Sequence, residues 1–258
     1  MKADARRDEI ADYIMQAGQA RIEDLVVHFG VSRMTIHRHV DRLAHQGVLR
    51  KLHGTVTVQP SGLYESAFRY RETVGKAEKA ALARAALAHV EPGQAVMLDD
   101  STTGAALADL LAGVRPLTVI TNGLVSTNRL IDIDEIEVLC LGGTYHRTFN
   151  AFIGLTTERA VAALRANVFF CSASAVEGGT AFIQDAQVTK VKQAMMAAAS
   201  RRILLLDSSK FGKVALNVFA DLTAFDVVLA TDRLADNVRA DLLARGVPLS
   251  ITRTGRTS

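Results

Sequence analysis

The chain opens with three segments in which apolar residues recur at helical spacing. The predicted helices span residues 5–17, 22–29 and 31–47. In the third segment, Ile36, Val40 and Leu43 fall at positions i, i+4 and i+7, so they form one apolar stripe that can pack on the other two helices. Residues 19–21, between the first two helices, are expected to be a short link.

Turn and cap signals surround the third segment. The hydroxyl of Ser32 can accept a backbone N–H that the first helical turn leaves unpaired, and Gly47 supplies a left-handed stop. Gly30-Val31-Ser32 makes a tight turn between two helices, which predicts a helix-turn-helix arrangement. Residues 48–58 alternate apolar and polar side chains around His53-Gly54, as in a two-stranded wing, with a plain hairpin edge as the alternative.

The polar face of the third segment is basic. The side chains that point away from its apolar stripe are Arg33, Thr35, His37, Arg38 and Arg42. Residues 28–54 contain five Arg or Lys residues and one acidic residue, whereas residues 59–258 contain 21 basic and 20 acidic residues. Because the excess is local, it suits contact with the phosphates of DNA. A solvated helix face is the alternative interpretation.

Beyond residue 93, short apolar strands alternate with helical patterns. The expected strands are residues 95–99, 117–121, 136–141, 168–174, 202–207, 226–230 and 248–251. The expected helices are residues 103–113, 124–131, 156–166, 186–199 and 234–245, preceded by an alanine-rich helix over residues 76–90. Continuous apolar strands separated by amphipathic helices indicate a parallel sheet covered on both faces. The predicted fold class is therefore α/β, a Rossmann-like sensor domain with room for one added edge strand.

Polar clusters follow five of these strands. They are Asp99-Asp100-Ser101-Thr102-Thr103-Gly104, Thr121-Asn122-Gly123, Leu141-Gly142-Gly143, Glu177-Gly178-Gly179 and Asp207-Ser208-Ser209-Lys210. In open α/β sheets, ligands bind at the carboxyl ends of the strands, so we expect a ligand site here. A strand-to-helix turn also needs glycine or a hydroxyl cap, and this is the alternative explanation for any single cluster.

The residue types in these clusters favour a phosphorylated ligand. Ser101, Thr102 and Thr103 open a helix, so their hydroxyls and free backbone N–H groups can surround a phosphate at the positive helix end. Lys210 can add a full charge. Sugar hydroxyls can bind to Asp99 and Asn122. The remaining candidates for effector binding are Gly142, Gly143 and Glu177.

The length and composition of the chain limit how many domains it can form. Its 258 residues are 49% hydrophobic, which suffices for a small domain (1–58), a linker (59–75) and a large domain (76–258). No apolar run reaches membrane-spanning length and the first ten residues have no signal-peptide core, so a cytoplasmic protein is expected. Cys140 and Cys171 lie in strand-like runs without a CxxC partner, so free buried thiols are expected, and neither a metal nor a cofactor is.

The N-terminal pattern resembles the winged-helix domain of DeoR-type bacterial transcription regulators, whose signature is VSxxTIRRDLxxLxxxGxLxRxHGG. Residues 31–55 of this chain read VSRMTIHRHVDRLAHQGVLRKLHGT. The departures include His37, His39 and Thr55, which stand where the family has arginine, aspartate and glycine. The resemblance implies binding to double-stranded DNA, and the departures concern the operator sequence rather than the mode of binding.

The resemblance continues through the rest of the chain. The family motif F-x-x-R looks like Phe68 and Arg71, its Glu-Lys pair looks like Glu78-Lys79, and its LDxGTT looks like residues 98–103. Its TN looks like Thr121-Asn122, and its LGG looks like residues 141–143. Its VKxxM looks like the helix of Lys192, and its DSSKFG looks like residues 207–212. Ser101 replaces the glycine of LDxGTT. The family implies a sensor domain related in fold to ribose-5-phosphate isomerase and glucosamine-6-phosphate deaminase, and a phosphosugar ligand that usually relieves repression.

The resulting hypothesis is a repressor of a carbohydrate-utilisation operon that a phosphorylated sugar or polyol releases from its operator. A homo-oligomer, dimer or tetramer, would place two recognition helices in successive major grooves. Arg33 and Arg38 are the expected base readers, near Ser32, Thr35 and His37. The expected phosphate contacts are Arg42, Arg50, Lys51 and His53. Histidines 37, 39, 45 and 53 predict pH-sensitive DNA binding.

Two other hypotheses use the same residues differently. A sugar-phosphate isomerase or deaminase would need a carboxylate beside the substrate carbonyl, and Glu177 and Asp185 are available, although no enzyme motif surrounds them. A DNA-binding protein that has lost its ligand response would be unaffected in induction by replacement of Lys210.

Overall fold

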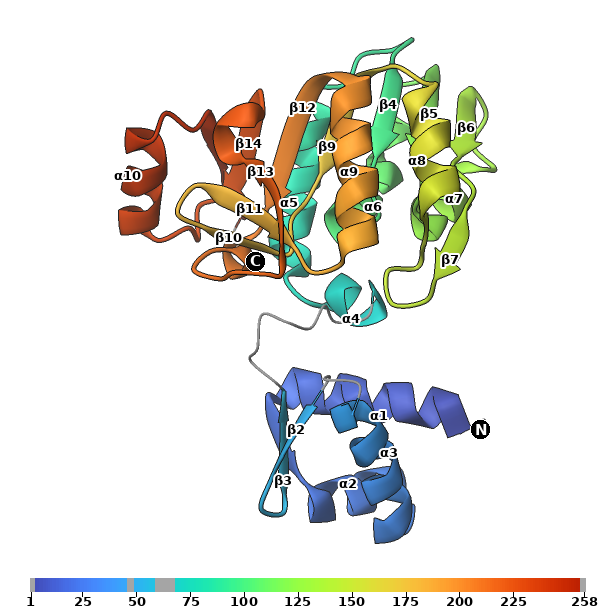
Figure 1. Cartoon of the computed structure of the whole chain (residues 1–258), viewed down its shortest axis with the longest axis vertical. Helices are drawn as coiled ribbons and strands as arrows, with labels where there is room; N and C mark the ends of the chain where they lie inside the picture. Colours follow the sequence, from blue (N-terminus) through green and yellow to red (C-terminus); the bar gives the residue numbers. More distant parts are fainter. Residues whose placement is uncertain (1–2, 46–48, 59–67, 256–258) are drawn as a thin grey trace. The chain divides into compact units, whose positions relative to one another are not determined.

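The computed structural model describes residues 3–45, 49–58 and 68–255 (Figure 1). Backbone contacts divide the chain into two compact units, Met1–Ser66 and Ala67–Ser258, and each is described by itself. The predicted helix stop at Gly47 and residues 59–67 of the predicted linker lie outside the described residues. Within the described ranges, no helix is both long enough and apolar enough to cross a membrane.

The first unit contains the three predicted helices and a small sheet. Its elements are α1 (Ala3–Ala17), β1 (Gln19–Arg21), α2 (Ile22–Phe29), α3 (Arg33–His45), β2 (Leu49–Leu52) and β3 (Thr55–Val58). The predicted stripe on α3 is confirmed, since Ile36, Val40 and Leu43 are at most 4% exposed. These side chains share the core with Ile10 and Ile14 of α1.

The predicted link over residues 19–21 is wrong, because these residues form strand β1. It pairs antiparallel with β3, Ala20 opposite Val56, and completes a three-stranded sheet in the order β1-β3-β2. The β2–β3 hairpin confirms the predicted wing. A strand of three residues is too short to show periodicity, so only its pairing partner reveals it.

The second unit is built on a seven-stranded parallel sheet, which confirms the predicted fold class. Its strands are β4 (Ala95–Leu98), β5 (Leu117–Thr121), β6 (Ile136–Cys140), β9 (Ala166–Cys171), β12 (Ala199–Leu206), β14 (Val227–Thr231) and β15 (Leu249–Thr252). The strand order is β15-β14-β12-β9-β4-β5-β6, and every neighbouring pair is parallel. All carboxyl ends therefore share one edge, and the order reverses between β4 and β9, where ligands of such sheets bind.

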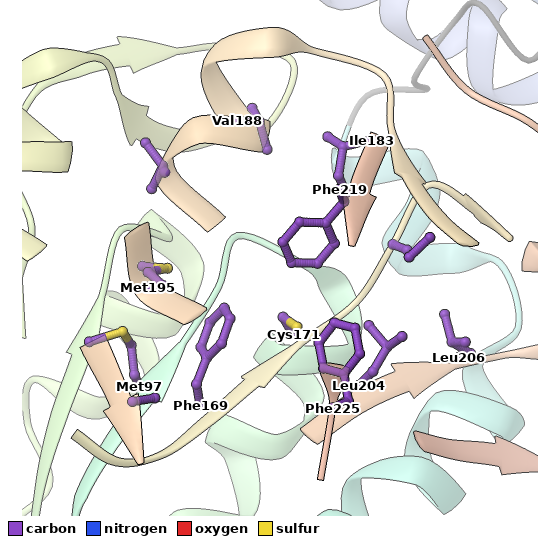
Figure 2. Close-up of a cluster of buried hydrophobic side chains, with 14 of the residues drawn as sticks. Met97, Phe169, Cys171, Ile183, Val188, Met195, Leu204, Leu206, Phe219 and Phe225 are labelled. Atoms are coloured by element: carbon purple, nitrogen blue, oxygen red, sulfur yellow. The ribbon is translucent and has the colours of Figure 1, made fainter. Parts of the chain in front are cut away.

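Helices cover both faces of this sheet. They are α5 (Lys76–Leu87), α6 (Thr102–Leu111), α7 (Leu124–Leu130), α8 (Leu155–Ala162), α9 (Ala186–Ala198) and α10 (Asp236–Ala244). Leu82 of α5 and Leu107 of α6 belong to one buried cluster, whereas Val161 of α8 and Met195 of α9 belong to the other, part of which Figure 2 shows. The strands are apolar at consecutive positions because both of their faces are buried.

Several elements of the second unit have no counterpart in the sequence pattern. They are α4 (Phe68–Thr73), the hairpin of β7 (Thr144–His146) and β8 (Ala151–Ile153), and an antiparallel sheet of β10 (Ala175–Glu177), β11 (Thr180–Ile183) and β13 (Asn217–Asp221). Glu177 therefore ends β10 and Gly178-Gly179 is the turn of the β10–β11 hairpin, so the expectation that these residues follow a strand of the main sheet is wrong. Both cysteines are free, but only Cys171 is buried, because Cys140 is exposed at the end of edge strand β6.

Candidate functional site

The polar face of α3 begins at a capped end. The backbone N–H of Thr35 donates to the Ser32 hydroxyl oxygen at 3.2 Å, which confirms the predicted cap. Arg33, Arg38 and Arg42 are exposed on this helix, and Thr35 and His37 are half-buried. On the wing, Arg50, Lys51 and His53 are exposed. The DNA-binding candidates thus all lie where solvent reaches them at least in part.

Acidic residues hold two of the basic candidates. Arg33 pairs with Glu23 of α2 at 3.1 Å, and Lys51 pairs with Asp41. Exposed pairs of this kind contribute about 1 kcal/mol or less, so a DNA phosphate can compete with the carboxylate. Arg38, Arg42 and Arg50 have no acidic partner in the part of the chain that the structure describes.

His39 does not belong to this face. It is 2% exposed, and neither ring nitrogen has a hydrogen-bond partner among the described residues. Burial lowers the pKa of His39, and the nearby Arg38, Arg6, Arg7 and Arg42 lower it further. His39 is one of four histidines predicted to make DNA binding pH-sensitive, but its ring occupies the core of the unit and does not face solvent. The side chain of His45 lies outside the described residues.

In the second unit, the loop after β4 forms the N-terminal cap of α6. The Ser101 hydroxyl accepts the backbone N–H of Gly104 at 2.9 Å, and Ser101 also offers its carbonyl to Ala105. The cap leaves the backbone N–H groups of Thr102 and Thr103 without an acceptor among the described residues, as expected in a first helical turn. These two N–H groups, at the positive end of α6, are suited to an anion.

Asp99 lies beneath this loop and binds other parts of the protein. Its carboxylate accepts from the backbone N–H groups of Ser101 (2.9 Å) and Ser172 (2.8 Å) and from Lys192 Nζ (2.6 Å). The side chain is fully buried. Asp99 is therefore placed to hold the ends of β4 and β9 to α9, and it does not reach a solvent-borne sugar in this conformation, contrary to the expectation from sequence.

Lys192 completes a buried charge cluster with Asp99 and Asp100. Its Nζ also donates to the Ser172 carbonyl (3.0 Å) and lies 3.3 Å from Asp100 Oδ1. Burial would lower the pKa of Lys192, but Asp100 and Asp99 outweigh burial and raise it. Burial raises the pKa of Asp100 although Lys192 opposes the shift. Lys192 is absent from the candidates named from residue chemistry, and only the family motif marks it.

Two buried polar atoms on either side of this cluster lack a partner. Asn122 Oδ1, after β5, and Ser172 Oγ, after β9, make no hydrogen bond within the described ranges. The Asn122 amide is oriented by β8, since its Nδ2 donates to the Phe152 carbonyl at 3.0 Å. Buried polar atoms normally have partners, so these two atoms mark a place for the hydroxyls of a ligand or for water.

Gly142 and Gly143 follow β6 and differ in their surroundings. The Gly142 carbonyl accepts from the Thr157 hydroxyl at 2.7 Å. A Cβ atom at Gly143 would lie 2.2 Å from Thr157 Oγ1 and 2.8 Å from the Ile153 carbonyl oxygen, and the φ of +145° also requires glycine. Gly143 is therefore explained by the approach of β8 and α8, whereas a Cβ atom at Gly142 would meet nothing within 4 Å.

Lys210 ends the short helix η1 (Ser208–Lys210) after β12 and is half-buried. The buried Glu78 of α5 holds this loop by accepting from the backbone N–H (2.8 Å) and hydroxyl (2.9 Å) of Ser208, and it also accepts from the Thr231 hydroxyl. By contrast, Glu177 is exposed on the β10–β11 hairpin, outside the main sheet. The structure thus brings the ends of β4, β5, β9 and β12 to one edge and places Glu177 elsewhere.

Comparisons with known proteins agree with this division into two parts. A family model described as the DeoR-like helix-turn-helix domain matches residues 6–61, and one described as the DeoR C terminal sensor domain matches residues 75–233. A solved ribose 5-phosphate isomerase from Methanocaldococcus jannaschii aligns with 53% of this chain and 54% of that chain, at 17% identity and a TM-score of 0.38.

Curated relatives match over nearly the whole chain. The L-fucose operon activator of Haemophilus influenzae is 30% identical over 235 residues, 90% of this chain and 94% of that protein. The lactose phosphotransferase system repressor of Staphylococcus epidermidis is 31% identical, covering 87% and 90%. The glycerol-3-phosphate regulon repressor of Escherichia coli is 26% identical, covering 88% and 90%.

Proposed function

This chain belongs to the DeoR family of DNA-binding transcriptional regulators, and from that premise we propose that it represses a carbohydrate-utilisation operon until a phosphorylated sugar or polyol binds. Relatives named as repressors of lactose and glycerol-3-phosphate genes support repression, whereas the fucose relative is named as an activator. The names of the relatives support an effector drawn from sugar and polyol metabolism.

The arrangement of α3 supports the proposed mode of DNA binding. Arg38 projects from a capped helix whose apolar stripe is buried, as expected of a helix that reads the major groove. A single winged helix binds weakly, so we propose that a homo-oligomer places two such helices on one operator. Arg42, Arg50 and His53 would contact phosphate, together with Lys51 once DNA replaces Asp41.

One observation carries the effector proposal: the unpaired Asn122 Oδ1 and Ser172 Oγ lie at strand ends on either side of β4, whose loop also presents the free N–H groups of α6. An anionic group suits the helix N-terminus, and hydroxyl groups suit the two oxygens. Lys210 adds positive charge from the end of β12. A phosphorylated polyhydroxyl compound combines both chemistries.

The effector must bind the DNA-releasing arrangement more tightly than the DNA-binding arrangement, since equal affinity would shift nothing. The test is a titration of the full-length protein on DNA from its own promoter region, repeated with a panel of sugar and polyol phosphates. Unphosphorylated sugars and inorganic phosphate are the controls. Specific binding that one phosphate ester abolishes supports the proposal. Specific binding that no ester changes would contradict the effector chemistry and leave the DNA-binding assignment in place.

The rival enzyme hypothesis has weaker support. Of its two carboxylates, Glu177 is exposed on a hairpin, and Asp185 caps α9 by accepting from the backbone N–H groups of Gln187 and Val188. The curated relatives cited above are named as regulators. Turnover of aldose or ketose phosphates by the purified protein would favour the enzyme, so this assay accompanies the DNA titration.

A further inference from the structure

Helix α4 is held to the rest of the second unit by contacts with three separate segments. The backbone N–H of Phe68 donates to the Thr148 carbonyl between β7 and β8 at 2.8 Å. Lys79 of α5 donates its ammonium to the Arg71 carbonyl, and Glu72 pairs with Arg129 of α7. Figure 1 shows α4 at one end of the α/β unit, below α6 and α9 in that view. A helix of six residues thus depends on its neighbours for its position.

The side chain of Arg71 lies near two aromatic rings and acts electrostatically on Asp100, in the loop after β4. Its guanidinium carbon is 5.7 Å from the ring centre of Phe68 and 5.8 Å from that of Phe149. It is close enough to Asp100 to lower the pKa of that carboxyl, against the larger effect of burial. Arg71 therefore brings positive charge from α4 to the end of β4, where α6 begins.

Lys79 is buried among charges of both signs. It is 7% exposed, and burial lowers its pKa to about 8. Asp207 and Glu72 oppose this shift, whereas Lys210 and Arg71 add to it. Arg71 of α4 and Lys210 at the end of β12 thus both repel the Lys79 ammonium, which Asp207 attracts, and a bound anion would relieve the repulsion.

We propose that Arg71, Lys79 and Lys210 together bind the anionic group of the effector, and that this contact couples α4 to the occupancy of the site. The inference rests on the proposed function and names additional binding residues for the same effector. With the site empty, repulsion between the like charges of Arg71, Lys79 and Lys210 offsets part of the contacts that hold α4. With the site occupied, one anion draws them together. The effector therefore tightens α4 onto the second unit.

The position of α4 in the chain links the anion contact to the DNA-binding unit. It is the first described element after residues 59–67, which follow the wing strand β3. A ligand that fixes α4 therefore acts directly on the chain segment leading to the DNA-binding unit. Differential docking of α4 is the kind of two-state element that allosteric release requires.

The probe for this site is sulfate, because it remains a dianion throughout the pH range in which Lys79 titrates. Binding is measured by calorimetry on the full-length protein, with chloride added to keep the ionic strength constant. We expect Arg71→Gln and Lys79→Gln each to weaken sulfate binding about tenfold or more, the effect of one charge-assisted contact. Lys76→Gln, which changes an exposed lysine of the same helix, should leave binding unchanged.

The pH profile and amide exchange give independent readouts. Wild-type affinity should fall as pH rises above about 8, where Lys79 loses its proton, and Lys79→Arg should remove this fall. Sulfate should slow amide exchange in residues 68–73 of the wild type but not of Arg71→Gln. If Lys79→Gln does not fold, as judged by circular dichroism, then Arg71→Gln and Lys79→Arg still test the proposal. Failure of the wild type to bind sulfate, or equal binding by Arg71→Gln, would overturn the proposal.

Failure here is distinguishable from failure of the proposed function. If no phosphate ester releases the wild type from DNA, the effector chemistry proposed above is wrong. Suppose instead that an ester releases all three proteins from DNA, the wild type, Arg71→Gln and Lys79→Arg, with the same dependence on concentration and pH. The proposed function then stands, and the coupling through α4 is wrong. Release lost in Arg71→Gln, with DNA affinity retained, supports the coupling.

Met34, the second residue of α3, is an apolar side chain on the surface of the first unit. It is 81% exposed, whereas Ile36, Val40 and Leu43 of the same helix are at most 4% exposed. Met34 lies one turn before Arg38 and therefore on the same face as that candidate base reader. N-terminal residues of a recognition helix contact base edges, so an exposed apolar side chain here has a specific candidate partner.

We also infer that Met34 contacts the 5-methyl group of a thymine, the apolar group that the major groove presents. Replacing operator thymines singly by deoxyuridine removes only that methyl group. For the wild type, we expect about a fourfold loss of affinity at one or two positions, the effect of burying one methyl group. Met34→Ala should be insensitive at those positions. Val27→Ala, which changes a residue of α2 that is 83% exposed, should keep the wild-type sensitivity. Equal deoxyuridine sensitivity of Met34→Ala and wild type would overturn the inference.

Discussion

The two units use charge in opposite ways. In the first unit, Arg33 and Glu23 form an ion pair whose side chains are 65% and 58% exposed. In the second unit, Lys192 and Asp99 form a pair whose side chains are 6% and 0% exposed. The exposed pair can be exchanged for DNA phosphate at little cost, whereas breaking the buried pair leaves a charge without compensation. A nucleic-acid surface benefits from charges that can change partner, and a small-molecule site benefits from charges that cannot.

The largest effect should come from breaking the buried cluster. Lys192→Met leaves Asp99 and Asp100 in the core without their cation, so we expect a loss of about 3–5 kcal/mol in the free energy of unfolding of the second unit. Urea unfolding followed by circular dichroism measures the loss. Lys190→Met, an exposed lysine of the same helix, is the control. A loss below about 1 kcal/mol would show that the cluster is not held by charge pairing.

Arg38→Ala tests the exposed charges directly. Loss of a base contact should weaken operator binding by about 1–3 kcal/mol and relax the sequence preference at one position. Arg50→Ala, on the wing, should instead weaken binding to all sequences alike and reduce the slope of log K against log salt by about one. Binding titrations on operator variants at several salt concentrations separate the two. Unchanged affinity and preference for Arg38→Ala would show that α3 is not the recognition helix.

His39 is an exception to this contrast between exposed and buried charges, because it is a buried titratable group in the first unit. Its folded pKa is lowered below 6.5, so the unfolded chain binds protons more readily, and stability is lost as pH falls through 6.5 toward the folded pKa. His39→Phe should remove this acid sensitivity and stabilise the unit by roughly 1 kcal/mol, since two unpaired nitrogens disappear. Thermal unfolding at pH 5 and pH 8 checks this, with His53→Gln as the exposed control. Persistent acid sensitivity in His39→Phe would assign it to another group.

The smallest effect should come from Glu23→Gln. The change frees Arg33 from its exposed partner, so DNA affinity should rise by about 1 kcal/mol or less, a few-fold in the dissociation constant. The stability of the unit should hardly change. Weaker DNA binding after this substitution would indicate that Glu23 orients Arg33 for contact instead of competing with DNA.

Local interactions explain what could be predicted from sequence. The span of α2, the buried stripe of α3 and the Ser32 cap depend on residues three to seven positions apart, and a pattern along the chain records these. Consecutive apolar residues likewise predicted the strands of the parallel sheet, because both faces of each strand are buried. The edge at which their polar ends meet followed from the fold class alone.

Tertiary structure alone decided which of these residues act together. Asp99 and Lys192 are separated by 93 positions, and Glu78 binds Ser208 and Thr231 across 130 and 153 positions. The pattern at Glu177 suggested a strand end, but a hairpin carries it away from the sheet. His39 is among the histidines expected to make DNA binding pH-sensitive, but its ring lies in the core. Periodicity reports that a side chain is buried or exposed, whereas the partner that neutralises a charge or accepts a hydrogen bond is chosen only when distant segments pack.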